Sequence, residues 1–420
     1  MIEDKRRVLG ARNSKEVSQC QVCDGKDLKS VLFLGFLPPV NLMQKAGEPL
    51  SEQPAYPAEL LYCSRCSLVQ LGLVVSASIL FPAEYPYTSS TTRVLRENFA
   101  ELSGEARSLV TISGEDLIVD IGSNDGNLLS NFKDHMRVLG ITPEDIGKIA
   151  VQRGIPTLCA YFDADAVAAV LREHGKAKLV TATNVFAHID GVHDVVNGIK
   201  DLLSDDGVFI SESHYLMGLV ETLQYDAVYH EHLRYYSVRS LQYLLGMHDL
   251  EVFHAKRIPT HGGSVRVYAG HRGKYRVRES VAGILDEERS RGLGENELLE
   301  FRKKVLSTKL ELLAMLRELK AAGKTIHGIS APSRASTLIN YVGIDDGMVD
   351  FVFEVDGSHK IGNYVPGTRI PIVNEQRLFE TQPDYAILFS WHIADELIPK
   401  LRHKGYTGKF IVPLPQPRIV

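Results

Sequence analysis

The sequence predicts an α/β protein with a small cysteine-containing N-terminal module, a central Rossmann-like domain and a second, smaller Rossmann-like domain at the C-terminus. Three observations support this prediction. Two Cys-x2-Cys pairs lie in the turn-rich first 80 residues. Strand-like apolar runs alternate with helical patterns between about residues 90 and 250. The same alternation restarts after residue 323, as expected for parallel sheets with crossover helices.

The bulk composition is that of a globular protein with two or three domains. The 420 residues are 44% hydrophobic and 24% charged, and they are too many for one ordinary core. The formal net charge is −5, with Lys and Arg spread along the chain, which argues against a nucleic-acid partner. The sequence contains no run of eighteen apolar residues and no apolar leader segment. We therefore expect no membrane span, no secretory signal and a cytoplasmic location.

Four of the five cysteines form two pairs, Cys20-x2-Cys23 and Cys63-x2-Cys66. Each pair places two thiolates on one side of a tight turn, and two such turns complete a tetrahedral Zn²⁺ site. Four buried or redox-active cysteines are the alternative, which the paired spacing disfavours. Four protein ligands leave no position for water, so we expect a structural zinc. Cys159 is left over and is expected to be an inert buried thiol.

The segment Val119–Asn127, VDIGSNDGN, stands where the first βα turn of a doubly wound sheet belongs. Its glycines let the backbone pass close to a ligand beside a helix N-terminus. It lacks the Gly-x-Gly-x-x-Gly pattern of a dinucleotide loop and suits the aminoacyl end of S-adenosyl-L-methionine (SAM). A turn that simply needs glycine is the alternative. The cofactor-binding residues predicted at this edge are Asp120, Gly122, Asn124, Asp125 and Asn184.

The segment Tyr225–Ser237 is the densest polar and aromatic stretch, with two histidines, a glutamate and four tyrosines. His230 and His232 do not have the spacing of a His-Glu-x-x-His metal helix. A histidine beside a carboxylate suits general base chemistry near neutral pH, whereas a histidine-rich surface loop is the alternative. His188 follows another strand-like run, so we expect it near the cofactor.

The remaining segments predict a hairpin, a long helix and the C-terminal domain. Two apolar runs flank Thr260–Gly263 and predict the hairpin. Apolar residues recurring every seven positions predict a bridging helix over about 296–322. Strand-like runs at 325–330, 351–356, 385–391 and 409–415 predict the second α/β domain. The predicted units are 1–85, the zinc module; 86–255, the central domain; 256–322, the hairpin and helix; and 323–420, the C-terminal domain.

Taken in order, these motifs resemble the sugar C-methyltransferases over nearly the whole chain from about residue 18. The resemblance rests on the paired cysteines, IGSNDGN, NVFAHI, YHEHLRYYS, HGGSVRVY, PGTRIPI, SWHIADELI and KFIVPLP. This family, which includes the tetronitrose and mycarose types, acts on 4-keto deoxysugar nucleotides. The resemblance implies a SAM methyltransferase that methylates C-3 or C-5 beside the ketone. A histidine removes the ring proton, and the enolate attacks the SAM methyl group.

The resemblance also implies residue roles. His232 matches the base of the family's Tyr-x-Glu-His segment, and Tyr229 and Glu231 hold the sugar or orient the base. His188 stabilises the developing enolate oxygen. Substrate-binding residues would be Tyr85 and Tyr87, which precede the central domain, and Arg334 in the C-terminal domain. His327 and Lys360 are further candidates for holding the nucleotide half of the substrate.

Two positions depart from the family pattern. Relatives commonly carry Gly-Val-Glu-Pro after the second strand, where the carboxylate binds the SAM ribose, but Thr142 stands in place of that Glu. Glu144 or Asp145 would have to substitute, or SAM binds more weakly. Relatives often have Lys in place of Arg334, although a guanidinium also suits a diphosphate.

Two other functions compete with this prediction. Zinc knuckles also occur beside SAM domains in RNA methyltransferases, although the acidic net charge argues against RNA. A catalytically silent binding protein would explain Thr142, but it has no need for His232, Tyr229, Glu231 and His188 together. The expected partner is a nucleotide-linked 4-keto sugar, with no nucleic acid or membrane, and the expected protein is a monomer or weak oligomer.

Overall fold

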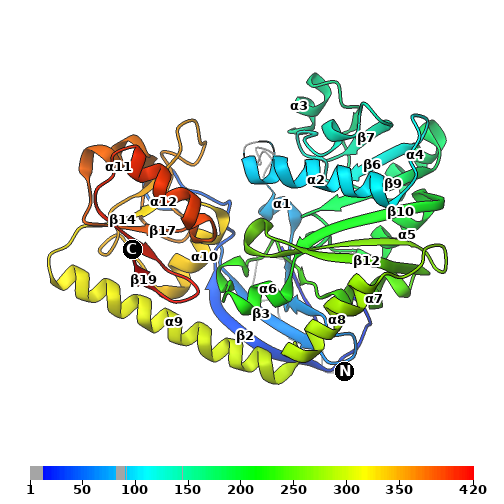
Figure 1. Ribbon diagram of the computed structural model, residues 1–420. Coiled ribbons are helices and arrows are strands. Elements are labelled where there is room, and N and C mark those ends of the chain that lie inside the picture. Colours follow the sequence, from blue (N-terminus) through cyan, green and yellow to red (C-terminus); the bar gives the residue numbers. More distant parts are fainter. Residues whose placement is uncertain (1–12, 82–89, 91, 144) are drawn as a thin grey trace, which may run out of the picture.

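The computed structural model describes residues 13–81, 90, 92–143 and 145–420. Figure 1 shows two α/β bodies side by side, with the long helix α9 (Glu295–Ala321) passing along the lower side of both. The predicted fold class is confirmed, because each body contains a mainly parallel sheet with helices. Within the described ranges, no helix combines the length and apolar character needed to cross a bilayer.

The N-terminal module contains a four-stranded antiparallel sheet of order β11-β4-β3-β2. Its strands are β2 (Leu28–Leu37), β3 (Tyr56–Cys63), β4 (Val69–Leu71) and β11 (Arg234–Tyr235). Nearby lie the paired strands β1 (Ser14–Glu16) and β5 (Leu73–Val75), and the short helix α1 (Ala77–Leu80). β11 lies in the segment Tyr225–Ser237, called the histidine-rich segment below, which contains the predicted catalytic residues. The zinc module and this segment therefore share one sheet.

The central domain contains a seven-stranded sheet of order β12-β13-β10-β9-β6-β7-β8. The strands are β6 (Leu117–Ile121), β7 (Arg137–Ile141), β8 (Thr157–Leu158), β9 (Ala177–Thr183), β10 (Leu203–His214), β12 (Leu250–Ile258) and β13 (Ser264–His271). The helices are α2 (Arg93–Leu109), α3 (Gly147–Gln152), α4 (Ala164–His174), α5 (Val192–Leu202), α6 (Leu216–Glu221), α7 (Val238–Gly246) and α8 (Glu279–Arg291). The strands from β8 to β10 are mutually parallel, so their carboxyl ends meet at one edge.

The C-terminal domain contains a six-stranded sheet of order β16-β15-β14-β17-β18-β19. The strands are β14 (Ile326–Ile329), β15 (Val352–Glu354), β16 (Ile372–Asn374), β17 (Tyr385–Leu388), β18 (Lys409–Val412) and β19 (Arg418–Ile419). The helices are α10 (Ser333–Val342), α11 (Gln376–Thr381) and α12 (Ala394–His403). One apolar core joins this domain to the N-terminal sheet through α9 and includes Leu34, Leu298, Leu312 and Phe353.

Two details differ from the sequence predictions. The boundary expected between residues 255 and 256 falls inside β12, and the predicted hairpin is the antiparallel edge of the central sheet. The hairpin therefore belongs to the central domain, because β13 completes its hydrogen bonding on β10. Cys159, expected to be buried, is exposed, since it directly follows the short strand β8.

Candidate active site

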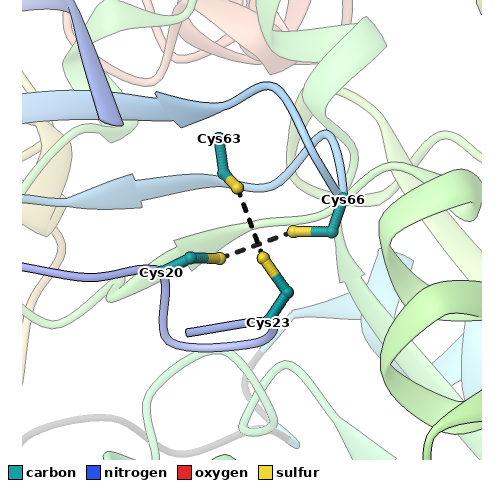
Figure 2. Close-up of side chains that lie close together, drawn as sticks. All are labelled: Cys20, Cys23, Cys63 and Cys66. Atoms are coloured by element: carbon teal, nitrogen blue, oxygen red, sulfur yellow. Dashed lines mark hydrogen bonds between the residues drawn. The ribbon is translucent and has the colours of Figure 1, made fainter. Parts of the chain in front are cut away.

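The sulfurs of the four paired cysteines point toward one another between the two Cys-x2-Cys turns, called knuckles below (Figure 2). The Sγ atoms of Cys20 and Cys66 lie 3.4 Å apart, as do those of Cys23 and Cys63, and all four lie within 4.8 Å of one another. A tetrahedron with Zn–S bonds of about 2.3 Å has edges of about 3.8 Å, so this arrangement fits Zn²⁺. In the described part of the chain, no second group of His, Cys, Asp and Glu offers a metal site.

The predicted cofactor loop leaves β6 at the carboxyl edge of the central sheet. Gly122 has φ +71°, and a Cβ there would lie 2.7 Å from Cγ2 of Val185. Only glycine therefore fits, and the loop packs directly on the segment that follows β9. Because the backbone NH of His188 donates to the carbonyl of Val185 at 2.9 Å, the same short segment connects the cofactor loop to a predicted catalytic histidine.

Two predicted cofactor-binding carboxylates have partners within the protein. Asp120 is buried, and its Oδ1 accepts a hydrogen bond from Thr181 Oγ1 at 2.6 Å. Burial raises the pKa of Asp120 to about 7. Asp125 is fully buried, and its Oδ2 accepts from Arg153 Nη1 at 2.8 Å. Both contacts hold the loop in shape.

Other polar groups at this edge lack hydrogen-bond partners. Among the described residues, Ser123 Oγ, Asn127 Nδ2 and Asn184 Oδ1 are buried without one. Leaving a buried polar group unpaired costs about 1–3 kcal/mol. Asn124 and Asn184 also have φ of +51° and +57°, a conformation that clusters at functional sites in residues other than glycine. These groups fit a polar ligand such as the amino-acid end of SAM.

Around Thr142, where relatives carry the Glu that binds the SAM ribose, the described residues offer no free carboxylate. Thr142 is buried at the end of β7, and Cys159 lies close by, because a Cβ on Gly147 would meet both side chains. Glu144 lies outside the described residues. Asp145 is exposed and pairs with Lys148 at 2.8 Å, so its carboxylate is occupied at the surface.

The structure places two other predicted catalytic residues beside His232. The centroid of its ring lies 4.9 Å from that of His188 and 4.2 Å from that of Tyr229. A histidine that the sequence analysis missed, His214, lies 5.0 Å away at the end of β10. His188 was identified because it follows the carboxyl end of a parallel strand. The same criterion applies to His214, which ends β10.

The hydrogen bonding of His232 fixes its tautomer. Nδ1 lies 2.8 Å from the carbonyl oxygen of Ala227, and a carbonyl can only accept, so Nδ1 carries the proton. Nε2 of the neutral ring therefore carries a lone pair. Burial, followed by the charge that His188 would carry, holds the pKa of His232 well below 6.5. The ring is thus a free base at neutral pH.

Two further histidines were missed because only tertiary structure brings them here. His261, in the tight turn before β13, lies 5.6 Å from His214 and adopts φ +56°. His392 follows β17, and its Nδ1 accepts from Arg334 Nη1 at 3.1 Å. Burial lowers the pKa of His261 to about 4 and that of His392 to about 3, so both rings are neutral near pH 7.

Glu231 and Tyr229, the other two residues of the predicted catalytic segment, make different interactions. Glu231 is buried, and its Oε1 accepts from Asn41 Nδ2 of the N-terminal module at 2.6 Å. No sequence motif indicated a role for Asn41. Burial, followed by the charge of Glu231, raises the pKa of Tyr229 well above 10. Tyr229 therefore keeps its phenolic proton and can donate it in a hydrogen bond.

Arg334, predicted to bind substrate, uses most of its donors inside the protein. Its guanidinium pairs with buried Asp226, with Nε 3.1 Å from Oδ2, and donates to Gln224 Oε1 at 2.8 Å. Trp391 Nε1 donates to the same Asp226 carboxylate at 2.7 Å. Because Arg334 and Trp391 belong to the C-terminal domain, this network fixes that domain against the histidine-rich segment. The other predicted substrate residues, Tyr85 and Tyr87, lie outside the described residues.

Comparisons with known proteins match nearly the whole chain. Residues 20–81 match a family model of a zinc binding domain, residues 87–255 a methyltransferase domain and residues 259–415 a C-methyltransferase C-terminal domain. The zinc predicted from the cysteines is therefore confirmed by the matched family and by the buried quartet.

The chain is also similar to a curated relative and to solved structures. The C-methyltransferase NovU of Streptomyces niveus is 32% identical over 411 residues, which cover 97% of this chain and 97% of NovU. An S-adenosylmethionine-dependent methyltransferase of Clostridium acetobutylicum is 12% identical, with coverage of 44% of this chain and 94% of that one and a TM-score of 0.31. The CcbJ methyltransferase of Streptomyces caelestis is 12% identical, with 42% and 90% coverage and a TM-score of 0.33.

Proposed function

Because this chain belongs to the C-methyltransferase family, we propose that it transfers a methyl group from SAM to C-3 or C-5 of a nucleotide-linked 4-keto-deoxysugar. The predicted membership and the predicted methyltransferase activity are both confirmed at the level of C-methylation. The 4-keto sugar substrate, the ring carbon that is methylated and the use of a histidine as the base go beyond that confirmed activity. They rest on the site and on the resemblance of the motifs.

The observation that carries the proposal is the contact of His232 Nδ1 with a carbonyl, which leaves Nε2 unprotonated. Its Nδ1 proton is held by the carbonyl of Ala227, and its ring lies among His188, His214 and Tyr229. A neutral imidazole with a fixed tautomer is suited to remove a proton from a carbon beside a ketone. RNA methylation gives no comparable reason for a buried base of this kind.

The chain's residues divide the reaction between them. His232 Nε2 accepts the ring proton, and the electron pair of the broken C–H bond moves into an enolate. His188, kept neutral because burial and then the charge of Arg234 lower its pKa to about 4, offers a ring N–H to the enolate oxygen. Tyr229 offers its phenolic proton. The low pKa of His232 then favours release of the captured proton to solvent.

SAM, when bound, supplies a sulfonium methyl group that a carbon nucleophile can take. The amino-acid end of SAM would be held by the cofactor loop at Gly122 and by the unpaired polar atoms of Ser123, Asn127 and Asn184. With no carboxylate at Thr142, the ribose hydroxyls would depend on hydroxyl and backbone groups.

Deuterium exchange tests the proposed function directly. Incubated in heavy water with a TDP- or GDP-linked 4-keto sugar and no SAM, the enzyme should incorporate deuterium at C-3 or C-5, and SAM should then methylate the same carbon. NMR and mass spectrometry of the sugar read both steps. Methylation of RNA with no exchange would contradict the proposal, and so would absence of SAM binding by calorimetry, as expected of a silent binding protein.

The pH dependence of turnover should reflect the depressed pKa of His232. The base must be unprotonated, and its folded-state pKa lies well below 6.5. Activity should therefore stay level as pH falls from 8 to 6.5 and decline only at lower pH. The measurement is kcat/KM for the sugar nucleotide between pH 4.5 and 8.5, and a midpoint at or above pH 6.5 would contradict the assignment.

A further inference from the structure

Arg234 is a fully buried arginine that enters the proposed reaction only through its charge, which helps to lower the pKa of His188. It lies in β11, two residues after His232, and is 1% exposed. Its Nε donates to Tyr236 Oη at 3.0 Å, Nη1 donates to Gln21 Oε1 and to the Asp190 carbonyl at 3.2 Å, and Nη2 donates to the Ile189 carbonyl. Every one of these acceptors is neutral.

The absence of a carboxylate partner sets Arg234 apart from the other buried arginines. Arg266 pairs with buried Glu212 at 2.5 Å and Arg334 with buried Asp226 at 3.1 Å. No ion pair joins Arg234 to a carboxylate within the described residues. Burying an uncompensated charge is costly, so a negative group of another kind is expected to offset it.

The zinc site is a negative group that lies one residue along the chain from an acceptor of Arg234. Gln21, which accepts from Arg234, stands between Cys20 and Cys23 in the first knuckle. Metal-bound thiols are deprotonated, so four thiolates and one Zn²⁺ carry a net charge of −2. The Gln21 backbone is fixed as well, because its NH donates to Gln70 Oε1 at 2.9 Å, and Gln70 faces Arg234 across the β4–β11 pair.

On its other side, Arg234 holds the segment of His188. Its acceptors Ile189 and Asp190 directly follow that histidine. The neighbouring Leu233 NH donates to the carbonyl of Ala187 at 3.0 Å. The Arg234 guanidinium thus contacts both the zinc knuckle and the two residues after His188. Strand β11, which carries Arg234, begins two residues after His232.

We propose that Arg234 is a positioning residue that couples the zinc knuckle to the two catalytic histidines, with the zinc thiolate centre as its counter-ion. The coupling itself is a property of the fold, while its effect on turnover rests on the proposed function. Misplacing reacting groups by about 1 Å can cost about 10²-fold in rate, so fixing both histidines through one rigid group has a direct catalytic consequence.

Replacing Arg234 tests the coupling. In Arg234→Met we expect kcat to fall at least about tenfold, with KM and SAM affinity within about threefold and zinc retained. Histidine NMR on isotope-labelled protein, with His188 assigned through His188→Gln, should show a raised His188 pKa, because a nearby positive charge is gone. In Arg234→Lys the charge remains, so the His188 pKa should stay low, while kcat recovers only in part.

Two further variants keep the test decisive. Lys178→Met removes a buried cation at the opposite end of β9, where its partner is Asp206 at 2.5 Å, and should leave kcat and the His188 pKa unchanged. Gln21→Leu removes only the acceptor on the zinc side and should shift the His188 resonances even if Arg234→Met does not fold. Wild-type kcat and unchanged His188 resonances in Arg234→Met, or unchanged resonances in Gln21→Leu, would overturn the coupling. The NMR result stands even if the wild-type protein does not methylate a sugar, so the two proposals fail separately.

Discussion

Replacing His232 with Asn should reduce turnover by about 10²–10⁴-fold, the range expected for loss of a general base. Asn can keep a hydrogen bond to the Ala227 carbonyl, which His232 makes at 2.8 Å, but it has no basic nitrogen. The fold and SAM affinity should therefore stay near normal. Initial rates of methyl transfer, with SAM affinity by calorimetry, measure the effect.

The deuterium exchange assay separates this role from that of His188. His232→Asn should slow exchange at the sugar carbon as much as it slows turnover, because the group that removes the proton is gone. His188→Asn should slow exchange and methyl transfer together, because the enolate is less stable. A control at a partly exposed histidine, His248→Asn, should keep turnover within about twofold. Full exchange in His232→Asn would move the base assignment to another histidine.

The sequence predicted the sheets well because their strands are buried on both faces. Runs such as LIVDI at Leu117–Ile121 are wholly buried, and buried parallel strands appear in sequence as continuous apolar stretches. The long helix could be predicted for a related reason: Leu298, Val305 and Leu312 face one core. Local pattern and tertiary burial agree at these positions.

The site could be predicted only where function coincided with a local pattern. His188 follows a parallel strand, and His232 stands in a conspicuous segment. His261 contacts His214 from a hairpin turn, His392 contacts Arg334 within another domain, and Asn41 reaches Glu231 across 190 residues of sequence. Contacts between residues so far apart in the chain produce no periodic pattern in the sequence, so they could not be predicted from it.

Removing one zinc ligand should have the largest effect on stability. Cys66→Ala leaves three thiols, of which Cys20 loses the partner that its Sγ approaches to 3.4 Å. Structural zinc contributes about 10–16 kcal/mol in zinc-finger peptides. Even a loss of about 4 kcal/mol would lower a thermal transition by roughly 8–16 °C. Zinc content by atomic absorption and Tm by calorimetry measure both effects.

Loss of the metal should also abolish turnover, because the module supports the catalytic segment. β4 pairs with β11, and the Leu71 NH donates to the Leu233 carbonyl at 2.9 Å, next to His232. Melting of the knuckles therefore frees the segment that carries the base. Cys159→Ala, outside the quartet, should keep both zinc and Tm. A Cys66→Ala protein with wild-type Tm and full turnover would show that the metal has no part in holding His232.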